Sequence, residues 1–345
     1  MIQESIEKAV SGINIPEAQM IETMEEIMEG KATQAQIGAL LVALRMKGET
    51  VDEITGAARV MRSKSAQIPY ELQDGEFLID TCGTGGDCSN TFNVSTTAAF
   101  VAAGAGVKVA KHGNRSVSSK CGSADLMEAL GLPLDLTPEQ VALCIHEVGI
   151  GFLFAPVMHK AMKHAIGPRR EIGLRTIFNL LGPLTNPAGA QVQVMGVYDD
   201  QMVEPLTHVI ARLGVKKAFV VHGHGGLDEI SLSGPTRMGT AQDGKVSFTY
   251  MDPSDFGVQA RPSFGIAGGS AKENAELTRS VLNGDPGEHR DMSLVNAAAA
   301  LVAAERAATF IEGMSLAAYS IDSGAARRKL EHLIKFARLL KDGGH

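Results

Sequence analysis

The first 65 or so residues repeat apolar and polar positions with the period of a helix. From Ile37 to Leu44, apolar residues recur at i, i+3, i+4 and i+7, which places them in one helical stripe. Residues 33–36 (Thr to Gln) and 50–53 (Thr to Glu) have capping-box spacing, Pro16 suits a first helical position and Gly30 a C-terminal cap. The pattern predicts three or four short helices packed into a small domain.

From Phe77 onwards the pattern changes to short β-rich runs separated by helical stretches. The runs are FLID at 77–80, VKVA at 107–110, IGFLFA at 150–155, VQVMGVY at 192–198 and AFVVHG at 218–223. Strands that alternate with helices predict a mostly parallel sheet covered by helices. A capping box at 270–273 and Ala-rich helices through Leu340 are expected to complete the cover.

A basic helical stretch between the third and fourth runs interrupts this alternation, and Gly182, Pro183 and Pro187 follow it. We expect the chain to return there to the helical domain before it resumes the sheet. The predicted fold is therefore α/β, with a small helical domain at 1–70, joined by a returning segment at about 155–185, and a larger α/β domain made of 71–154 and 186–345.

Composition narrows the possible partners. The 345 residues are 44% hydrophobic and 21% charged, as in an ordinary globular protein, and two domains sharing a cleft suit the length. A net charge of −7 argues against binding to nucleic acid or an anionic membrane. Four cysteines without a C-x-x-C pair, no long apolar run and no export leader predict a reduced protein in the cytoplasm.

The turn from Asp80 to Asp87 (DTCGTGGD) carries the strongest local signal for an anion site. Its three glycines follow a predicted strand and precede a helical run that begins near Val94, so backbone N–H groups and a helix N-terminus would face a phosphate. Many such turns are only tight connections. Neither a G-x-x-x-x-G-K-[ST] nor a G-x-G-x-x-G pattern is present. Small polar residues at 90–96 suit either N-capping or contact with phosphate and metal-bound water.

A second polar loop, Lys111 to Ser119 and on to Ser123, follows the strand VKVA. Loops at the carboxyl ends of strands in open α/β sheets are where ligands bind, so this loop is expected to share a crevice with the glycine turn. A solvated surface loop is the alternative.

Asp228 and Glu229 form an acidic pair after the strand AFVVHG. Two carboxylates about 4 Å apart repel by about 4 kcal/mol at an effective dielectric of about 20, so in a cleft they favour a cation. Magnesium suits one or two carboxylates plus substrate phosphates. An exposed acidic turn is the alternative, and zinc is disfavoured because His222 and His224 lack a third ligand nearby.

The returning segment could supply the group that binds an organic acid. Its basic residues are His159, Lys160, Lys163, His164, Arg169, Arg170 and Arg175. An arginine can grip a planar carboxylate with two hydrogen bonds, which suits an aromatic acid, whereas the other side chains fit a solvated face.

Taken together, five stretches resemble the anthranilate phosphoribosyltransferase family across nearly the whole chain. They are GTGGD at 83–87, NVST at 93–96, KHGNRSVSSKCGSAD at 111–125, RREIGLRTIFNLLGPLTNPA at 169–188 and LDEIS at 227–231. The resemblance implies Mg²⁺-dependent transfer of phosphoribosyl from phosphoribosyl pyrophosphate to anthranilate, in tryptophan biosynthesis. One departure is Cys88, where many relatives are expected to have glycine.

The resemblance also implies roles for particular residues. Phosphoribosyl pyrophosphate would contact Gly83, Gly86, Asp87, Thr91, Asn93, Val94, Ser95, Thr96, Lys111, His112, Gly113, Asn114, Arg115, Ser116, Val117, Ser118, Ser119 and Ser123. Anthranilate would contact Gly83, Asn114 and Arg169, with His112 and Pro183 as further lining residues. Two Mg²⁺ ions would bind Ser95, Asp228 and Glu229, and a homodimer would form through the helical domain.

Two other functions compete with this one. A pyrimidine nucleoside phosphorylase shares the expected fold and a K-H-G loop, but the chain is short for that family's extra C-terminal domain and N-R-S-V-S-S suits the transferase better. A non-catalytic paralogue that binds nucleic acid should be basic, whereas this chain is acidic.

Overall fold

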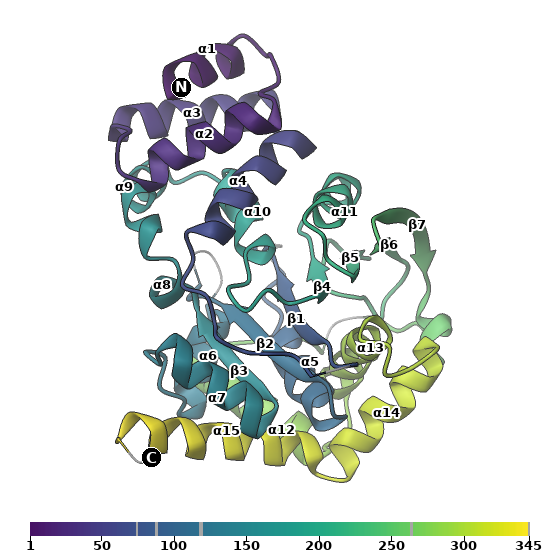
Figure 1. The fold of residues 1–345 in the computed structure, drawn as a ribbon. Helices are drawn as coiled ribbons and strands as arrows, with labels where there is room; N and C mark the ends of the chain where they lie inside the picture. The colour runs from purple at the N-terminus through teal and green to yellow at the C-terminus, as the bar shows by residue number, and fades with distance from the viewer. Residues whose placement is uncertain (74, 87–88, 117–119, 263–264, 344–345) are drawn as a thin grey trace.

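The computed structural model describes residues 1–73, 75–86, 89–116, 120–262 and 265–343, and it consists of a helical domain stacked on a larger domain built around one sheet (Figure 1). The predicted α/β fold with an N-terminal helical domain is confirmed. Within the described residues, no helix is long and apolar enough to cross a membrane.

Four N-terminal helices form the first part of the helical domain. They are α1 (Ile2–Val10), α2 (Glu17–Met28), α3 (Gln34–Lys47) and α4 (Val51–Ser63). The predicted stripe on α3 is buried, and both predicted capping boxes are present. Pro16 is the N-cap of α2 rather than its first helical residue, and Gly30 adopts the positive φ of 72° that ends the helix.

Seven strands form the central sheet, in the order β3-β2-β1-β4-β5-β6-β7. Their bounds are β1 (Leu78–Gly83), β2 (Lys108–Gly113), β3 (Ile150–Phe154), β4 (Val192–Gly196), β5 (Lys217–Gly223), β6 (Thr236–Gln242) and β7 (Lys245–Met251). The first five are parallel and correspond to the five predicted strands. The antiparallel hairpin β6–β7 was not predicted, although Asp243-Gly244 between its strands is a typical hairpin turn.

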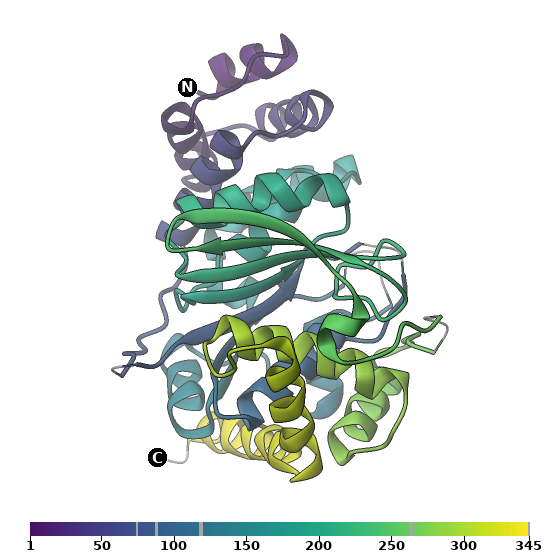
Figure 2. The same ribbon diagram turned by 90° about the vertical axis from the view of Figure 1, so that its right-hand side faces the viewer.

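Helices cover both faces of the sheet (Figure 2). The helices on one side share an apolar cluster with the sheet and are α5 (Val94–Gly104), α6 (Ser123–Leu130), α7 (Pro138–Val148), α12 (Ala271–Asn283), α13 (Glu288–Ala303), α14 (Phe310–Asp322) and α15 (Ala325–Lys341). The other face packs on α10 (Ile177–Leu184) and α11 (Val203–Arg212), and its apolar cluster continues into the helical domain. Short helical turns occur at 160–162, 200–202 and 253–256.

After β3 the chain returns to the helical domain through α8 (Ala155–Met158), α9 (Lys163–Ile172) and α10. Helix α9 contacts α3 and α2, and α10 contacts α4. The chain rejoins the sheet through residues 182–186, which we call the junction segment. We propose that the helical domain comprises residues 1–70 and the returning segment at about 155–185, and that 71–154 and 186–345 form the α/β domain.

Glu53 has a larger part in the helical domain than its predicted capping role. Its buried carboxylate accepts hydrogen bonds from the backbone N–H of Thr50 (2.8 Å) and of Ile15 (2.8 Å), and pairs with the Lys47 ammonium at 3.0 Å. One side chain thus ties the start of α4 to the end of α3 and to the segment before α2.

We predict that Glu53→Ala lowers the free energy of unfolding by about 3–5 kcal/mol, because it leaves two N–H groups without their acceptor and removes the only carboxylate that pairs with the largely buried Lys47 ammonium within the described residues. Urea denaturation measures the change. The matched control is Glu29→Ala, which removes an exposed partner of Lys31 and Lys64 and should barely move the midpoint. Equal midpoints for the two variants would contradict the prediction.

Candidate active site

The glycine turn lies at the carboxyl ends of β1 and β4, where the strand order changes direction. Gly85 and Gly86 have positive φ values of 66° and 75°. The backbone N–H of Gly85 donates to Oδ2 of Asp228 at 3.0 Å, and a Cβ on Gly83 would lie 2.5 Å from the same oxygen. Glycine is required at position 83 because the acidic loop approaches the turn so closely.

Helix α5 begins beside this turn. The N–H of Ser95 in its first turn donates to Oε1 of Glu229 at 3.0 Å, so a carboxylate already lies at the positive end of the helix. Asn93 is the N-cap residue, but its side chain makes no capping bond. Instead it donates to the Cys121 carbonyl at 3.2 Å and accepts from Asn274 at 3.0 Å, which joins α5 to α12.

The acidic pair is held by a helix that the sequence did not implicate. Asn296 of α13 is buried, accepts from the N–H of Ile230 at 2.9 Å and donates to the Ile230 carbonyl at 3.3 Å. The structure therefore brings together Gly83, Ser95, Asp228 and Glu229, as predicted. A single Asn in the Ala-rich run of α13 was the only sequence signal for this support.

The described part of the second loop, 111–116, is organised by Asp125. Its Oδ2 accepts from the N–H groups of Ser116 (3.0 Å) and Gly122 (2.9 Å), and Arg115 pairs with Asp125 and with Glu128. Burial favours the neutral acid, but these N–H groups and the Arg115 guanidinium outweigh it, so the pKa of Asp125 is lowered. Asp125 was not predicted as a site residue, although it has capping-box spacing from Gly122.

Lys111 and His112 are buried at the end of β2. The Lys111 ammonium donates to the Thr81 carbonyl at 2.6 Å. His112 donates from Nδ1 to the Gly182 carbonyl at 3.1 Å, and its Nε2 lies 3.2 Å from Nε2 of His159. Burial, with the neighbouring His159, lowers the pKa of His112 to about 3, so this imidazole is neutral at pH 7.

Two arginines of the returning segment pack against aromatic rings. The Arg169 guanidinium lies 5.1 Å from the centre of the Phe178 ring, and burial lowers its pKa. Within the described part of the chain, it has no hydrogen-bonded or ionic side-chain partner. Arg175, one of the arginines that the sequence offered for binding an organic acid, donates to the Gly86 carbonyl and stacks 4.2 Å from the centre of the Tyr198 ring.

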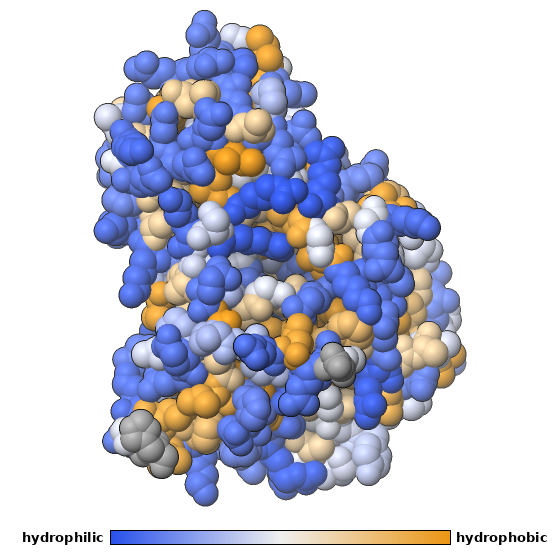
Figure 3. Space-filling model, in the orientation of Figure 1, coloured by the Kyte–Doolittle hydropathy of each residue, from blue (hydrophilic) through white to orange (hydrophobic). Residues whose placement is uncertain are grey.

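The remaining predicted residues lie around these groups. Val94 and Thr96 are buried on α5, Gly113 ends β2, the Thr91 hydroxyl accepts from Ser89 at 3.2 Å, and Ser123 donates to the Asn114 carbonyl at 3.4 Å. Asp87, Val117, Ser118 and Ser119 lie outside the described residues, as does Cys88. Hydrophilic side chains also gather on the surface where the two domains meet (Figure 3).

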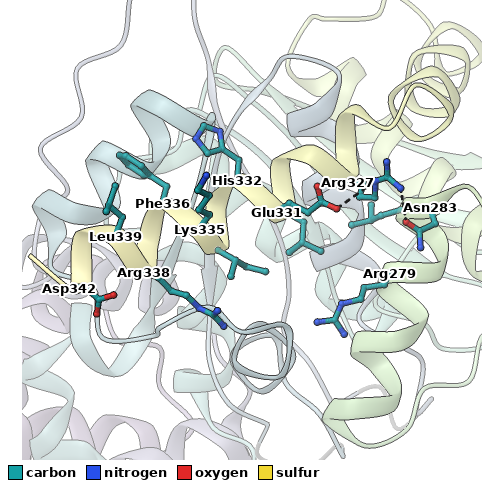
Figure 4. Close-up of a pocket in the computed structure, with 13 residues that line it drawn as sticks. Arg279, Asn283, Arg327, Glu331, His332, Lys335, Phe336, Arg338, Leu339 and Asp342 are labelled. Carbon is teal, nitrogen blue, oxygen red and sulfur yellow. Dashed lines mark hydrogen bonds and ion pairs between the residues drawn. The ribbon is translucent and has the colours of Figure 1, made fainter. Parts of the chain in front are cut away.

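A groove of about 880 Å³ lies elsewhere, between α12 and α15 (Figure 4). Arg279 and Arg338 line it and donate to the carbonyls of Leu130 and Gly131 at the end of α6. None of the predicted site residues lines this groove.

Comparison with known proteins identifies the family of the chain. A model described as the α/β domain of a glycosyl transferase family matches residues 75–327, and its helical bundle domain matches residues 3–65. The anthranilate phosphoribosyltransferase of Symbiobacterium thermophilum is 57% identical over 336 residues, which are 97% of this chain and 98% of that protein. The chain belongs to the anthranilate phosphoribosyltransferase family. The corresponding protein of Desulforamulus reducens is 54% identical over 340 residues, 99% of this chain and 98% of its own.

Solved structures of anthranilate phosphoribosyltransferases have the same fold. The enzyme from Thermus thermophilus superposes with a TM-score of 0.91 at 41% identity, over 97% of this chain and 99% of that one. The Saccharomyces cerevisiae enzyme in complex with PRPP and Mg gives 0.88 at 29% identity, over 98% of each chain. The same yeast enzyme in complex with 4-fluoroanthranilate gives 0.87 at 28% identity, over 98% and 97%. The resemblance predicted from the five stretches is confirmed.

We predict that Asp125→Ala speeds amide hydrogen exchange at Ser116 and Gly122 by at least about 10-fold, because both N–H groups lose a charged acceptor. Hydrogen exchange read by mass spectrometry measures the rates. Glu128→Ala is the matched control, since it removes only the exposed partner of Arg115. Unchanged protection in Asp125→Ala would show that another group orders the loop.

Proposed function

We propose that this chain transfers the phosphoribosyl group of 5-phosphoribosyl 1-diphosphate to anthranilate, giving N-(5-phosphoribosyl)anthranilate and diphosphate in tryptophan biosynthesis. Family membership supports the reaction. The main structural support is the acidic pair. Asp228 accepts a hydrogen bond from an N–H group of the glycine turn, and Glu229 accepts one from an N–H group at the N-terminus of α5. Carboxylates beside an anion-binding turn suit a substrate that arrives with a cation.

The oxygen donors around this pair fit magnesium. Asp228 and Glu229 supply carboxylates and Ser95 a hydroxyl, all of them hard ligands, and few enough to leave room for water and substrate phosphate. We propose that these three residues hold two Mg²⁺ ions and that turnover depends on them. Bound magnesium would spread the negative charge of the departing diphosphate. The yeast relative's complex with PRPP and Mg supports this assignment.

The chain's own groups would bind and orient the diphosphate sugar. The glycine turn and the positive end of α5 would face the phosphate groups, and the described part of the second loop, residues 111–116, would contact the substrate from the other side. We retain as proposed contacts all the residues named from the resemblance, from Gly83 to Ser123. Positive charge grows on the ribose as its bond to diphosphate breaks, so positioning and electrostatics carry most of the catalysis.

Arg169 is the proposed anchor for the anthranilate carboxylate. A desolvated guanidinium stacked on Phe178 keeps its donors available for bidentate binding of a planar acid. Gly83 and Asn114 complete the proposed contacts, and neutral His112 with Pro183 would line the ring. An aryl amine is already neutral near pH 7, so orienting it towards the ribose carbon suffices without a dedicated base.

We also propose a homodimer formed through the helical domain. Large apolar side chains are exposed at its outer end, namely Val10, Ile13 and Met46, which are 72%, 55% and 83% exposed. A second copy would remove this surface from water. The cytoplasmic location expected from reduced cysteines remains a prediction.

The function is tested by following anthranilate fluorescence with and without phosphoribosyl pyrophosphate and Mg²⁺. Loss of anthranilate should require both additions and should vanish in the double variant Asp228→Asn, Glu229→Gln, which keeps shape but removes the charge that holds the cation. The matched control is Glu22→Gln, Glu25→Gln on the exposed side of α2. No turnover by folded wild-type protein would refute the function; full activity of the double variant would refute only the metal site.

We predict that Arg169→Ala raises the KM for anthranilate about 100-fold, equivalent to about 3 kcal/mol, while the KM for phosphoribosyl pyrophosphate changes little. Steady-state kinetics with each substrate varied in turn measures both constants. Arg170→Ala, at the exposed neighbouring position, serves as the control. An unchanged anthranilate KM would remove Arg169 from this role.

A further inference from the structure

Three buried polar side chains on adjacent strands face the junction segment. His112 of β2 donates to the Gly182 carbonyl at 3.1 Å, and Gln193 of β4 donates to the Pro183 carbonyl at 2.5 Å. Between them, on β1, Oδ2 of Asp80 accepts from the Asn186 amide at 2.8 Å. Asp80 is the only carboxylate of the three, and it is fully buried.

Asp80 lies where the ladder between β1 and β2 is interrupted. The two strands run to Gly83 and Gly113, but their pairing register ends at Ile79 and Val109. Beyond that point the Ala110 carbonyl and the His112 N–H point to the same side of β2 and need other partners. The Asn186 amide donates to the Ala110 carbonyl at 2.8 Å, and Oδ1 of Asp80 accepts from the His112 N–H at 3.2 Å.

The two oxygens of Asp80 therefore serve both sides of the candidate site. One holds the backbone at the start of the loop 111–116, which is the proposed phosphoribosyl pyrophosphate side. The other holds the junction segment, which follows Arg169 along the chain and includes Pro183, on the proposed anthranilate side. Lys111 also extends into the gap between the strands, where its ammonium donates to the Thr81 carbonyl.

We propose that Asp80 is a positioning residue for phosphoribosyl transfer, and that its ionised carboxylate holds the loop 111–116 and the junction segment in register across the cleft. This inference rests on the proposed function. Only a carboxylate offers two acceptors and no donor; an Asn at position 80 would direct an N–H₂ group at either the His112 N–H or the Asn186 amide.

Burial sets the acidity of this group. It raises the pKa of Asp80 to about 6, although Lys111, the Asn186 amide and the N–H groups of His112 and Thr81 lower it. Lys111 and His112 face it from β2, Asn186 from the junction segment and the Cys82 thiol from its own strand. Protonation places an O–H where one of the two acceptors is needed, so catalysis should weaken as pH falls through about 6.

The loss of activity as pH falls through about 6, which we call the acidic limb of the pH–activity profile, can be separated from unfolding. The folded chain binds the Asp80 proton more tightly than the unfolded chain does, because the folded-state pKa of about 6 exceeds the ordinary value of 3.8. The contribution of Asp80 to stability therefore grows as pH falls from above 6 towards 3.8. A fall in activity over this pH range therefore reports a change in the position of the loop 111–116 and the junction segment, and thermal melting shows whether the protein stays folded.

The experiment compares kcat and KM for both substrates between about pH 5 and 9 in wild type, Asp80→Asn and Asn186→Ala. Asp80→Asn should raise the anthranilate KM at least about 10-fold at pH 8 and remove the contribution of Asp80 to the acidic limb. Asn186→Ala should keep that limb but move it to higher pH, because it removes a hydrogen bond that lowers the Asp80 pKa. Titration of the substrate phosphate is common to all variants.

Ser320→Ala is the matched control for a lost buried hydrogen bond, since the Ser320 hydroxyl donates to the Val101 carbonyl at 2.8 Å on the other face of the sheet. It should lower the melting temperature without moving KM or the acidic limb. If Asp80→Asn behaves like this control, the positioning role is overturned. If Asp80→Asn does not fold, the positioning role is overturned when the acidic limb of the pH–activity profile lies at the same pH in Asn186→Ala as in wild type. Wild type without activity would instead refute the proposed function itself.

Discussion

The last carbonyl groups of α10 depend on hydrogen bonds from residues outside the helix. A helix leaves its last carbonyls without internal partners, and a buried helix end must find donors elsewhere. Here the donors come from the sheet and from α4: His112, Gln193 and Arg62, whose Nε donates to the Leu184 carbonyl at 2.7 Å. Because these donors belong to both domains, the same bonds that complete a helix also fix how the domains face each other.

The two sides of the cleft that meet at this junction carry charged groups of opposite sign. On the sheet side, the carboxylates of Asp228 and Glu229 accept hydrogen bonds from backbone N–H groups, so this side of the cleft carries negative charge. On the helical side, a guanidinium lies on an aromatic ring without an acid of its own within the described chain. Under the proposed function, two anionic substrates could bind close together in a chain of negative net charge, because the carboxylates would hold a cation beside one substrate and the guanidinium would pair with the other.

Much of this arrangement is encoded locally and was predictable. Capping boxes, the stripe on α3, five strands and the acidic pair depend on neighbours in sequence, and the structure has them where they were expected. Asn296 escaped prediction because it acts on backbone atoms that are remote in sequence, and Asp125 because a stronger motif precedes it. Arg175 was a candidate, but its contact with the Gly86 carbonyl joins residues that are remote in sequence and was not predicted. The hairpin β6–β7 escaped because Gly239 interrupts the first strand and most side chains of β7 are exposed, which weakens alternation.

The interrupted helical domain has a consequence for synthesis on the ribosome. Helices α1–α4 end at Ser63, but α8 begins at Ala155, 92 residues later (155 − 63), and the apolar cluster of the bundle includes Ala165, Ile177 and Leu181. At about 5–20 residues per second, the first four helices wait about 5–20 s for the segment that covers them. During that interval the nascent bundle exposes the apolar face that the returning segment later buries. Complete burial of the bundle therefore has to wait until that segment has been translated.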